Sequence, residues 1–284
     1  MKTRVRLTVL ILCVLALPVA WANPATVKTP ATTEVPSTAI STSTAATDSK
    51  DSPDATDLVS GSLHQWRGDS SYTESTMLIH RPDWQRKSSL VAWTEGKSDS
   101  VVRFTAPAND AGNATLKLGP DLWLYNPKLG QVMKLPFSMM TQGWAGSDFS
   151  YNDLSKTDQI VTDYTHSISH IDTSGEHKTY TVECLPKPSA PVVWGKVELN
   201  VRDDYVLLAE TWFDQQLQPV RKLETTKVAP LDGRAYPVTM RMQVLEKPQE
   251  WTEITTQDGR FDLALPTYIF TLSNLRNPRP WSTP

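Results

Sequence analysis

Alternating hydrophobic and polar positions dominate the chain from about residue 70 onward. Val197, Leu199 and Val201 alternate with polar residues, and the same period of two recurs over 76–80, 91–94, 180–184 and 238–244. This period is typical of β-strands with one buried face. We count about ten such segments, broken by turn residues such as Arg81-Pro82-Asp83 and Asp258-Gly259, with no long apolar helix between them. The pattern predicts an antiparallel sheet that curls or splits into two sheets.

Two short helices interrupt this pattern. Asp54 is a helix-capping residue, and the apolar positions that follow predict a helix through Leu58 and Leu63 toward Trp66, ending at Gly68. Further along, Ser150 predicts the start of a short helix over residues 152–156.

The segment 134–154 is too apolar for an ordinary solvated loop and too irregular for a strand. It concentrates flexible and aromatic side chains, namely Met139, Met140, Trp144 and Phe149. Methionine adapts to irregular apolar partners, and tryptophan offers a large contact area. One interpretation is a lid or mouth that meets acyl chains, and the other is a loop packed into its own core. Both interpretations remain open. They are compatible if the loop fills the cavity whenever no ligand occupies it.

The N-terminus has the three regions of a secretory signal. Lys2, Arg4 and Arg6 precede an apolar run over 7–17, and Ala20-Trp21-Ala22 supplies small residues for cleavage. The run is short for a membrane span, which needs ~20 helical residues, so an uncleaved anchor is the less favoured alternative. We expect residues 1–22 to be a signal peptide and the mature protein to lie in the periplasm.

The segment 23–53 is rich in Ala, Thr, Ser and Pro and has almost no large apolar residues. Such a composition cannot bury enough surface to offset its conformational entropy, so we expect a disordered linker. Residues 54–284 are then expected to form one β domain, large enough for a single core. The linker either lets the domain reach away from a surface or is a passive tail.

Charge and cysteine content narrow the function classes. The whole chain has a net charge of −3, and loss of three basic residues with the signal leaves 25 basic against 31 acidic residues. An acidic exported protein is a poor candidate for nucleic-acid binding. Cys184 is the one cysteine outside the signal, and it alternates in phase with Val182, which predicts a buried, inert thiol.

No convincing catalytic constellation occurs in the sequence. His166 and His170 have the spacing of a helical metal site, but the surrounding segment 160–171 predicts a strand and no glutamate follows His166. The Gly146-Ser147-Asp148 stretch lacks the flanks of a nucleophile elbow, and no glycine-rich phosphate loop is present. We therefore expect no enzyme activity, no metal site and no cofactor.

Several motifs in a fixed order resemble a known family. They are Ile79-His80-Arg81-Pro82-Asp83-Trp84, Lys134-Leu135-Pro136, Met139-Met140, the run Trp144-Ala145-Gly146-Ser147-Asp148-Phe149, the run Val192-Val193-Trp194-Gly195-Lys196-Val197, and Phe261-Asp262 with Leu265-Pro266 and Phe270-Thr271. Over residues 55–277 the chain resembles the LolA-like outer-membrane lipoprotein-sorting proteins, in a largely uncharacterised branch. The long linker departs from that pattern.

The resemblance implies an open, incomplete antiparallel β-barrel with a few short helices and a loop covering its concave face. It also implies a periplasmic carrier whose cavity holds the acyl chains of a lipid or lipoprotein. Its partners would be that cargo and an inner-membrane exporter or an outer-membrane acceptor. The arginine that helps control lid opening in better-known carriers has no counterpart here that a motif identifies.

If the sheet curls as the resemblance implies, two neighbouring strands and the central loop supply the cavity surface. Alternation places Val91 with Trp93 on one face and Val102 with Phe104 on another, and we expect both faces to be concave. The predicted cavity and lid residues are Val91, Trp93, Val102, Phe104, Met139, Met140, Trp144 and Phe149. Two other functions stay open: a lipid-sensing or adaptor protein associated with a membrane exporter, and, less favoured, an exported hydrolase.

Overall fold

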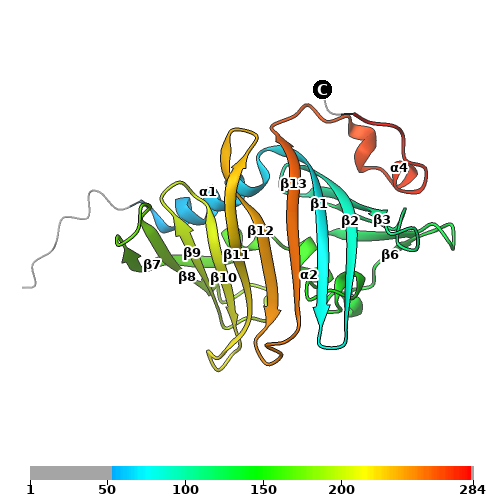
Figure 1. Cartoon of the computed structure of the whole chain (residues 1–284). Helices are drawn as coiled ribbons and strands as arrows, with labels where there is room; N and C mark the ends of the chain where they lie inside the picture. The colour runs from blue at the N-terminus through cyan, green and yellow to red at the C-terminus, as the bar shows by residue number, and fades with distance from the viewer. Residues whose placement is uncertain (1–52, 283–284) are drawn as a thin grey trace, which may run out of the picture. The chain divides into compact units, whose positions relative to one another are not determined.

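One curved antiparallel sheet makes up most of the described chain (Figure 1). The structure is a computed structural model that describes residues 53–282. The predicted signal peptide and the predicted linker, apart from residue 53, lie outside the described residues. The strands are β1 (Ser70–Arg81), β2 (Trp84–Glu95), β3 (Asp99–Ala106), β4 (Ala114–Leu118), β5 (Asp121–Asn126), β6 (Gln131–Lys134), β7 (Tyr164–Asp172), β8 (Thr179–Pro186), β9 (Lys196–Arg202), β10 (Leu207–Phe213), β11 (Pro219–Leu231), β12 (Arg234–Val244) and β13 (Trp251–Phe261).

The sheet consists of two meanders that join through a single strand pair. The 13 strands follow the order β6-β5-β4-β3-β2-β1-β13-β12-β11-β10-β9-β8-β7, so β1 pairs with β13 and the edges are β6 and β7. Every neighbouring pair is antiparallel, and the sheet does not close. This confirms the predicted fold class. Because the chain must pass from edge β6 to edge β7, the segment 135–163 crosses the open side of the sheet.

The helical elements are short and most of them lie beside this sheet. They are α1 (Ala55–Arg67), η1 (Phe137–Met139), η2 (Trp144–Gly146), α2 (Tyr151–Ser155), α3 (Gln159–Thr162), η3 (Thr267–Phe270) and α4 (Leu272–Arg276). Among residues 53–282, none of the helices has the length and hydrophobicity that crossing a membrane requires.

Both predicted helices are confirmed, together with their caps. The Asp54 carboxylate accepts hydrogen bonds from the amides of Thr56 and Asp57 at the start of α1, and Gly68, with φ of 62°, ends it. At α2, the side chains of Ser150 and Asp153 cap each other's backbone amides in a capping box. This cap fixes where the central segment turns back over the sheet.

Two local predictions are wrong. Asp258-Gly259 is not a turn but lies inside β13, where the pairing with β1 shifts by one residue between Glu74 and Ser75. Gly259 itself pairs with Thr73, and a Cβ at this position would lie 3.0 Å from Cδ2 of Leu231, so close packing rather than a turn favours glycine here. The predicted strand over 160–171 begins only at Tyr164, because the preceding residues form α3.

The core occupies both faces of the sheet. Under α1, residues Val182, Val197 and Val201 of the predicted alternation are fully or almost fully buried. Cys184 is also fully buried in this cluster, which confirms its predicted burial, and burial raises the pKa of its thiol. On the outer face, the C-terminal segment with η3 and α4 packs against β3 and β4 (Figure 1).

Candidate functional site

The concave face of the sheet encloses a cavity of about 490 Å³. Small-molecule and cofactor sites in proteins have volumes in this range. The sheet lines the cavity mainly with apolar side chains, among them Leu90, Ala92, Val102, Val197, Leu199, Trp212, Leu223, Met240, Met242 and Ile254. The covering side is formed by α1, the central segment and the β8–β9 connection, which contribute Val59, Leu63, Met140, Trp144, Phe149, Leu154, Ile160, Val192 and Trp194.

The register between β2 and β3 corrects the predicted direction of two side chains. Ala92 pairs with Val102 and Leu90 pairs with Phe104, and directly opposed residues of an antiparallel pair share a face. Leu90, Ala92 and Val102 all line the cavity. Val91 and Trp93 therefore lie on the outer face, and the expectation that they face the concave side is wrong.

Trp93 belongs to an aromatic cluster on that outer face. Its ring centroid lies 5.4 Å from that of Tyr72 and 6.0 Å from that of Trp281 in the C-terminal segment. The C-terminal segment thus buries part of the outer face as well. A strand covered on both sides alternates between two apolar sets, so alternation alone did not distinguish the concave face.

The other predicted residues gather at one wall of the cavity. Val102, Met140, Trp144 and Phe149 line it. Phe104 stands behind them, with its ring centroid 5.3 Å from that of Trp144. Met139 packs against the neighbouring cluster of Leu122, Leu135 and Met140. The central segment therefore packs against the sheet and also faces the cavity, while contact of these residues with a ligand stays a prediction.

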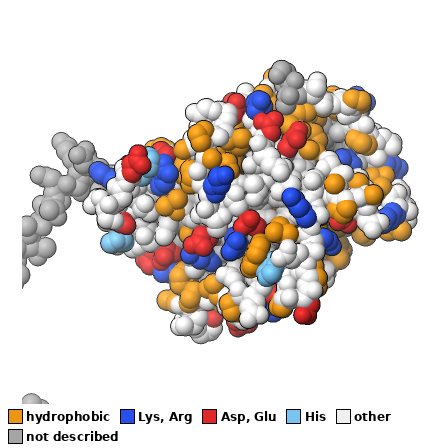
Figure 2. All heavy atoms as spheres, in the orientation of Figure 1, with side chains coloured by type: hydrophobic (Ala, Val, Ile, Leu, Met, Phe, Trp, Pro, Cys, Tyr) orange, Lys and Arg blue, Asp and Glu red, His pale blue; other side chains and the backbone are white. Residues whose placement is uncertain are grey.

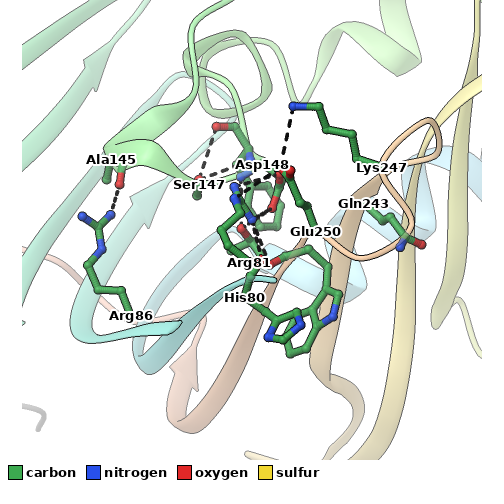
Figure 3. Close-up of polar contacts among 12 residues, drawn as sticks. His80, Arg81, Arg86, Ala145, Ser147, Asp148, Gln243, Lys247 and Glu250 are labelled. Carbon is green, nitrogen blue, oxygen red and sulfur yellow. Dashed lines mark hydrogen bonds and ion pairs between the residues drawn. The ribbon is translucent and has the colours of Figure 1, made fainter. Parts of the chain in front are cut away.

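An ion pair holds the central segment to the tip of the first hairpin (Figure 3). The guanidinium of Arg81 donates two hydrogen bonds, of 3.0 and 3.1 Å, to the carboxylate of Asp148. These side chains are 15% and 8% exposed. Asp148 also accepts a hydrogen bond of 2.6 Å from the hydroxyl of Thr252, and Arg86 donates to the carbonyl of Ala145. The hairpin motif and the central motif of the sequence thus form one structural anchor.

A second arginine anchors the same segment from the other half of the sheet. Arg221 donates hydrogen bonds of 3.2 and 2.7 Å to the carboxylate of Asp153, and one of 2.9 Å to the carbonyl of Asp148. Its guanidinium lies over the rings of Trp194 and Trp212, at 6.0 and 5.3 Å from their centroids. Any movement of the central segment away from the sheet must therefore break these ion pairs or be confined to residues that they do not hold.

Two exposed apolar side chains mark the opening of the cavity. Phe137 in the central segment is 85% exposed and Val193 in the β8–β9 connection is 63% exposed, yet both contribute to the cavity lining. Their exposure places both side chains where the cavity meets solvent.

One acidic residue faces the cavity from the sheet. Glu210 on β10 shares its face with Trp212 and pairs with Leu199 and Leu223 on the neighbouring strands. Burial, with a smaller contribution from Asp153, raises the pKa of Glu210 to about 8. The carboxyl group is therefore largely protonated near neutral pH.

Four of the five described histidines, namely His64, His80, His166 and His177, have side-chain or backbone partners. His166 bonds to the hydroxyl of Thr56 and the carbonyl of Ile160, and His80 stacks on Trp251. Within residues 53–282, the single group with metal-ligand spacing is His177, Asp203 and Asp204, on the surface and already engaged in ion pairs. Figure 2 shows no large patch of one charge on the face in view, where charged and hydrophobic side chains are interspersed.

Solved structures define the class of fold. A protein of the DUF1329 family from Desulfovibrio piger superimposes with a TM-score of 0.69 at 23% identity, over 78% of this chain and 97% of that one. A putative outer membrane lipoprotein-sorting protein domain from Vibrio parahaemolyticus gives 0.67 at 19%, over 78% and 98%. A LolA superfamily protein from Nitrosomonas europaea gives 0.65 at 19%, over 78% and 99%. The fold is thus LolA-like.

A family model identifies the group of proteins more narrowly. Residues 96–277 match the model of a family described as "Uncharacterized protein", and the chain belongs to that family. No curated protein matched the sequence. The family resemblance inferred from the motifs is therefore confirmed at the level of the fold.

Proposed function

We propose that this protein is a periplasmic carrier that binds the acyl chains of a lipid or lipoprotein in its cavity and helps move them toward the outer membrane. The observation that carries the proposal is the mainly apolar cavity of about 490 Å³ beneath an anchored cover. Exposing an acyl chain to water costs about 0.8 kcal/mol per methylene, so a carrier must enclose it. The fold shared with a putative lipoprotein-sorting domain supports the same conclusion.

The carrier is proposed to work without catalysis. Release to an acceptor requires that binding remain modest, and mixed methionine and aromatic surfaces bind varied apolar chains without a tight, specific fit. Met140, Met240 and Met242 supply such a surface here. The partners on either side would be an inner-membrane exporter and an outer-membrane acceptor.

Filling the cavity tests this proposal. Ala92 lines the cavity, and Ala92→Phe places a ring where the acyl chain would lie. Displacing two or more methylenes from the cavity should weaken binding of a fluorescent fatty-acyl probe at least about tenfold. Val91→Phe is the matched control, since it adds the same ring on the outer face of the same strand. Equal probe affinities of both variants and the parent would remove the cavity as the binding site.

A further inference from the structure

A buried arginine faces the cavity at the end of α1. Arg67 is 8% exposed and lines the cavity. Within residues 53–282, its side chain makes one hydrogen bond, 3.2 Å from Nη2 to the carbonyl of Gly96, and its Nε atom has no partner. An unpartnered donor on a buried cation is costly unless another group satisfies it.

A second buried cation lies close to this arginine. Lys117 on β4 is 4% exposed, and its Nζ donates to the carbonyl of Lys97 at 2.9 Å and to Asp158 at 3.4 Å. Burial lowers the pKa of both Lys117 and Arg67, and the charge of Arg67 lowers that of Lys117 further. The negative charge of Asp158 has the opposite effect and raises the pKa of both Arg67 and Lys117. Asp99 also raises the pKa of Lys117, whereas Asp158 is the one carboxylate of the described chain that raises the pKa of Arg67.

No other charged side chain that lines the cavity forms an ion pair with Arg67 within residues 53–282. Asp153 is paired with Arg221, and the burial of Glu210 keeps that carboxyl largely protonated. Lys156 also lines the cavity, and its Nζ donates to the carbonyl of Pro191 at 3.5 Å. Among residues 53–282, Arg67 thus lines the cavity as a buried cation with no direct ion pair, in an apolar surround where an anion is attracted more strongly than in water.

We infer that Arg67 binds the acidic head group, a carboxylate or phosphate, of the acyl-bearing cargo. This inference rests on the proposed function and narrows its cargo to anionic lipids. The guanidinium offers several donors in one plane, a geometry that matches both carboxylate and phosphate oxygens. The acyl chain would then extend from Arg67 along the apolar wall formed by the sheet.

The test compares ligands that differ only in the head group. Palmitate and hexadecanol have the same chain length, and each is used to displace the fluorescent acyl probe from the mature protein. The parent should bind palmitate about tenfold or more tightly than hexadecanol, the factor expected for a hydrogen bond to a charged group. Arg67→Gln should reduce that preference to about onefold and leave the affinity for hexadecanol unchanged.

The ratio of the affinities for palmitate and hexadecanol shows whether Arg67 recognises the head group or only stabilises the fold. Arg67 also stands in the last turn of α1, where a cation stabilises the helix, so Arg67→Gln should lower stability as well. A structural role alone would weaken both ligands equally, which would overturn the inference. Lys87→Gln is the control, because it removes the same charge from an exposed position of β2 and should leave the preference unchanged.

Two further comparisons show whether the bound anion is a lipid carboxylate, a lipid phosphate or free phosphate. An acylglycerol phosphate compared with the uncharged monoacylglycerol tests phosphate in place of carboxylate, and inorganic phosphate alone tests the head group without a chain. A preference for either charged lipid that depends on Arg67 supports the inference. Binding of all the lipids without preference overturns it and leaves the carrier intact, whereas no binding of any lipid removes both.

Discussion

Replacing Asp148 with asparagine is expected to lower the free energy of unfolding by about 3 kcal/mol. The change leaves the buried guanidinium of Arg81 without its two charged hydrogen bonds, and Glu250, at 3.4 Å from Nε, compensates only in part. In a domain of this size, the loss corresponds to a fall in melting temperature of roughly 6–12 °C. Thermal unfolding followed by circular dichroism measures it.

An exposed ion pair elsewhere on the sheet provides the control. Lys134 and Asp121 are 2.6 Å apart, with side chains 53% and 38% exposed. Such surface pairs contribute at most about 1 kcal/mol, so Asp121→Asn should change the melting temperature little. Similar melting temperatures for both variants would contradict the view that Arg81 and Asp148 anchor the cover of the cavity.

Replacing Met140 with glutamate is expected to abolish acyl binding while the protein still folds. Met140 is 8% exposed and lies on the covering side of the cavity. A carboxylate at this position would have to be desolvated by an entering acyl chain, at a cost of several kcal/mol. Without ligand, water in the cavity can solvate the charge. Probe affinity should therefore fall by at least about a hundredfold.

The control for Met140→Glu is a substitution two residues earlier in the central segment. Ser138→Glu introduces the same charge at an exposed residue of η1, and it should leave both the melting temperature and the probe affinity unchanged. A collapse of the Met140→Glu fold would show that the central segment is closed core. An intact fold with unchanged probe binding would remove Met140 from the cargo site.

Local sequence signals predicted most of the architecture. The cap at Asp54, the capping residue Ser150 and the alternation from Val197 to Val201 each depend on neighbouring residues, so the sequence displays them directly. The direction of Val91 and Trp93 could not be predicted in this way. Period two shows which residues share a face, but the cover on the outer face comes from Trp281, far along the chain.

The charged residues of the site were missed for a related reason. The partners in the pair of Arg81 and Asp148 are distant in sequence, as are those of Arg221 and Asp153, and no local pattern connects them. Glu210 did leave a signal, because it is a charged residue in phase with Trp212 on a strand with a buried face. Such a break in an apolar alternation indicates a cavity or a functional group.

Native mass spectrometry of the protein, purified without detergent, tests the central claim most directly. The account predicts that part of the protein carries one bound species with the mass of an acyl-bearing lipid, and that collisional activation releases it. The Ala92→Phe variant should carry less of that species than Val91→Phe, because only the first ring enters the cavity. Protein found wholly at its unliganded mass, even after incubation with the fatty-acyl probe, would contradict a carrier of acyl chains.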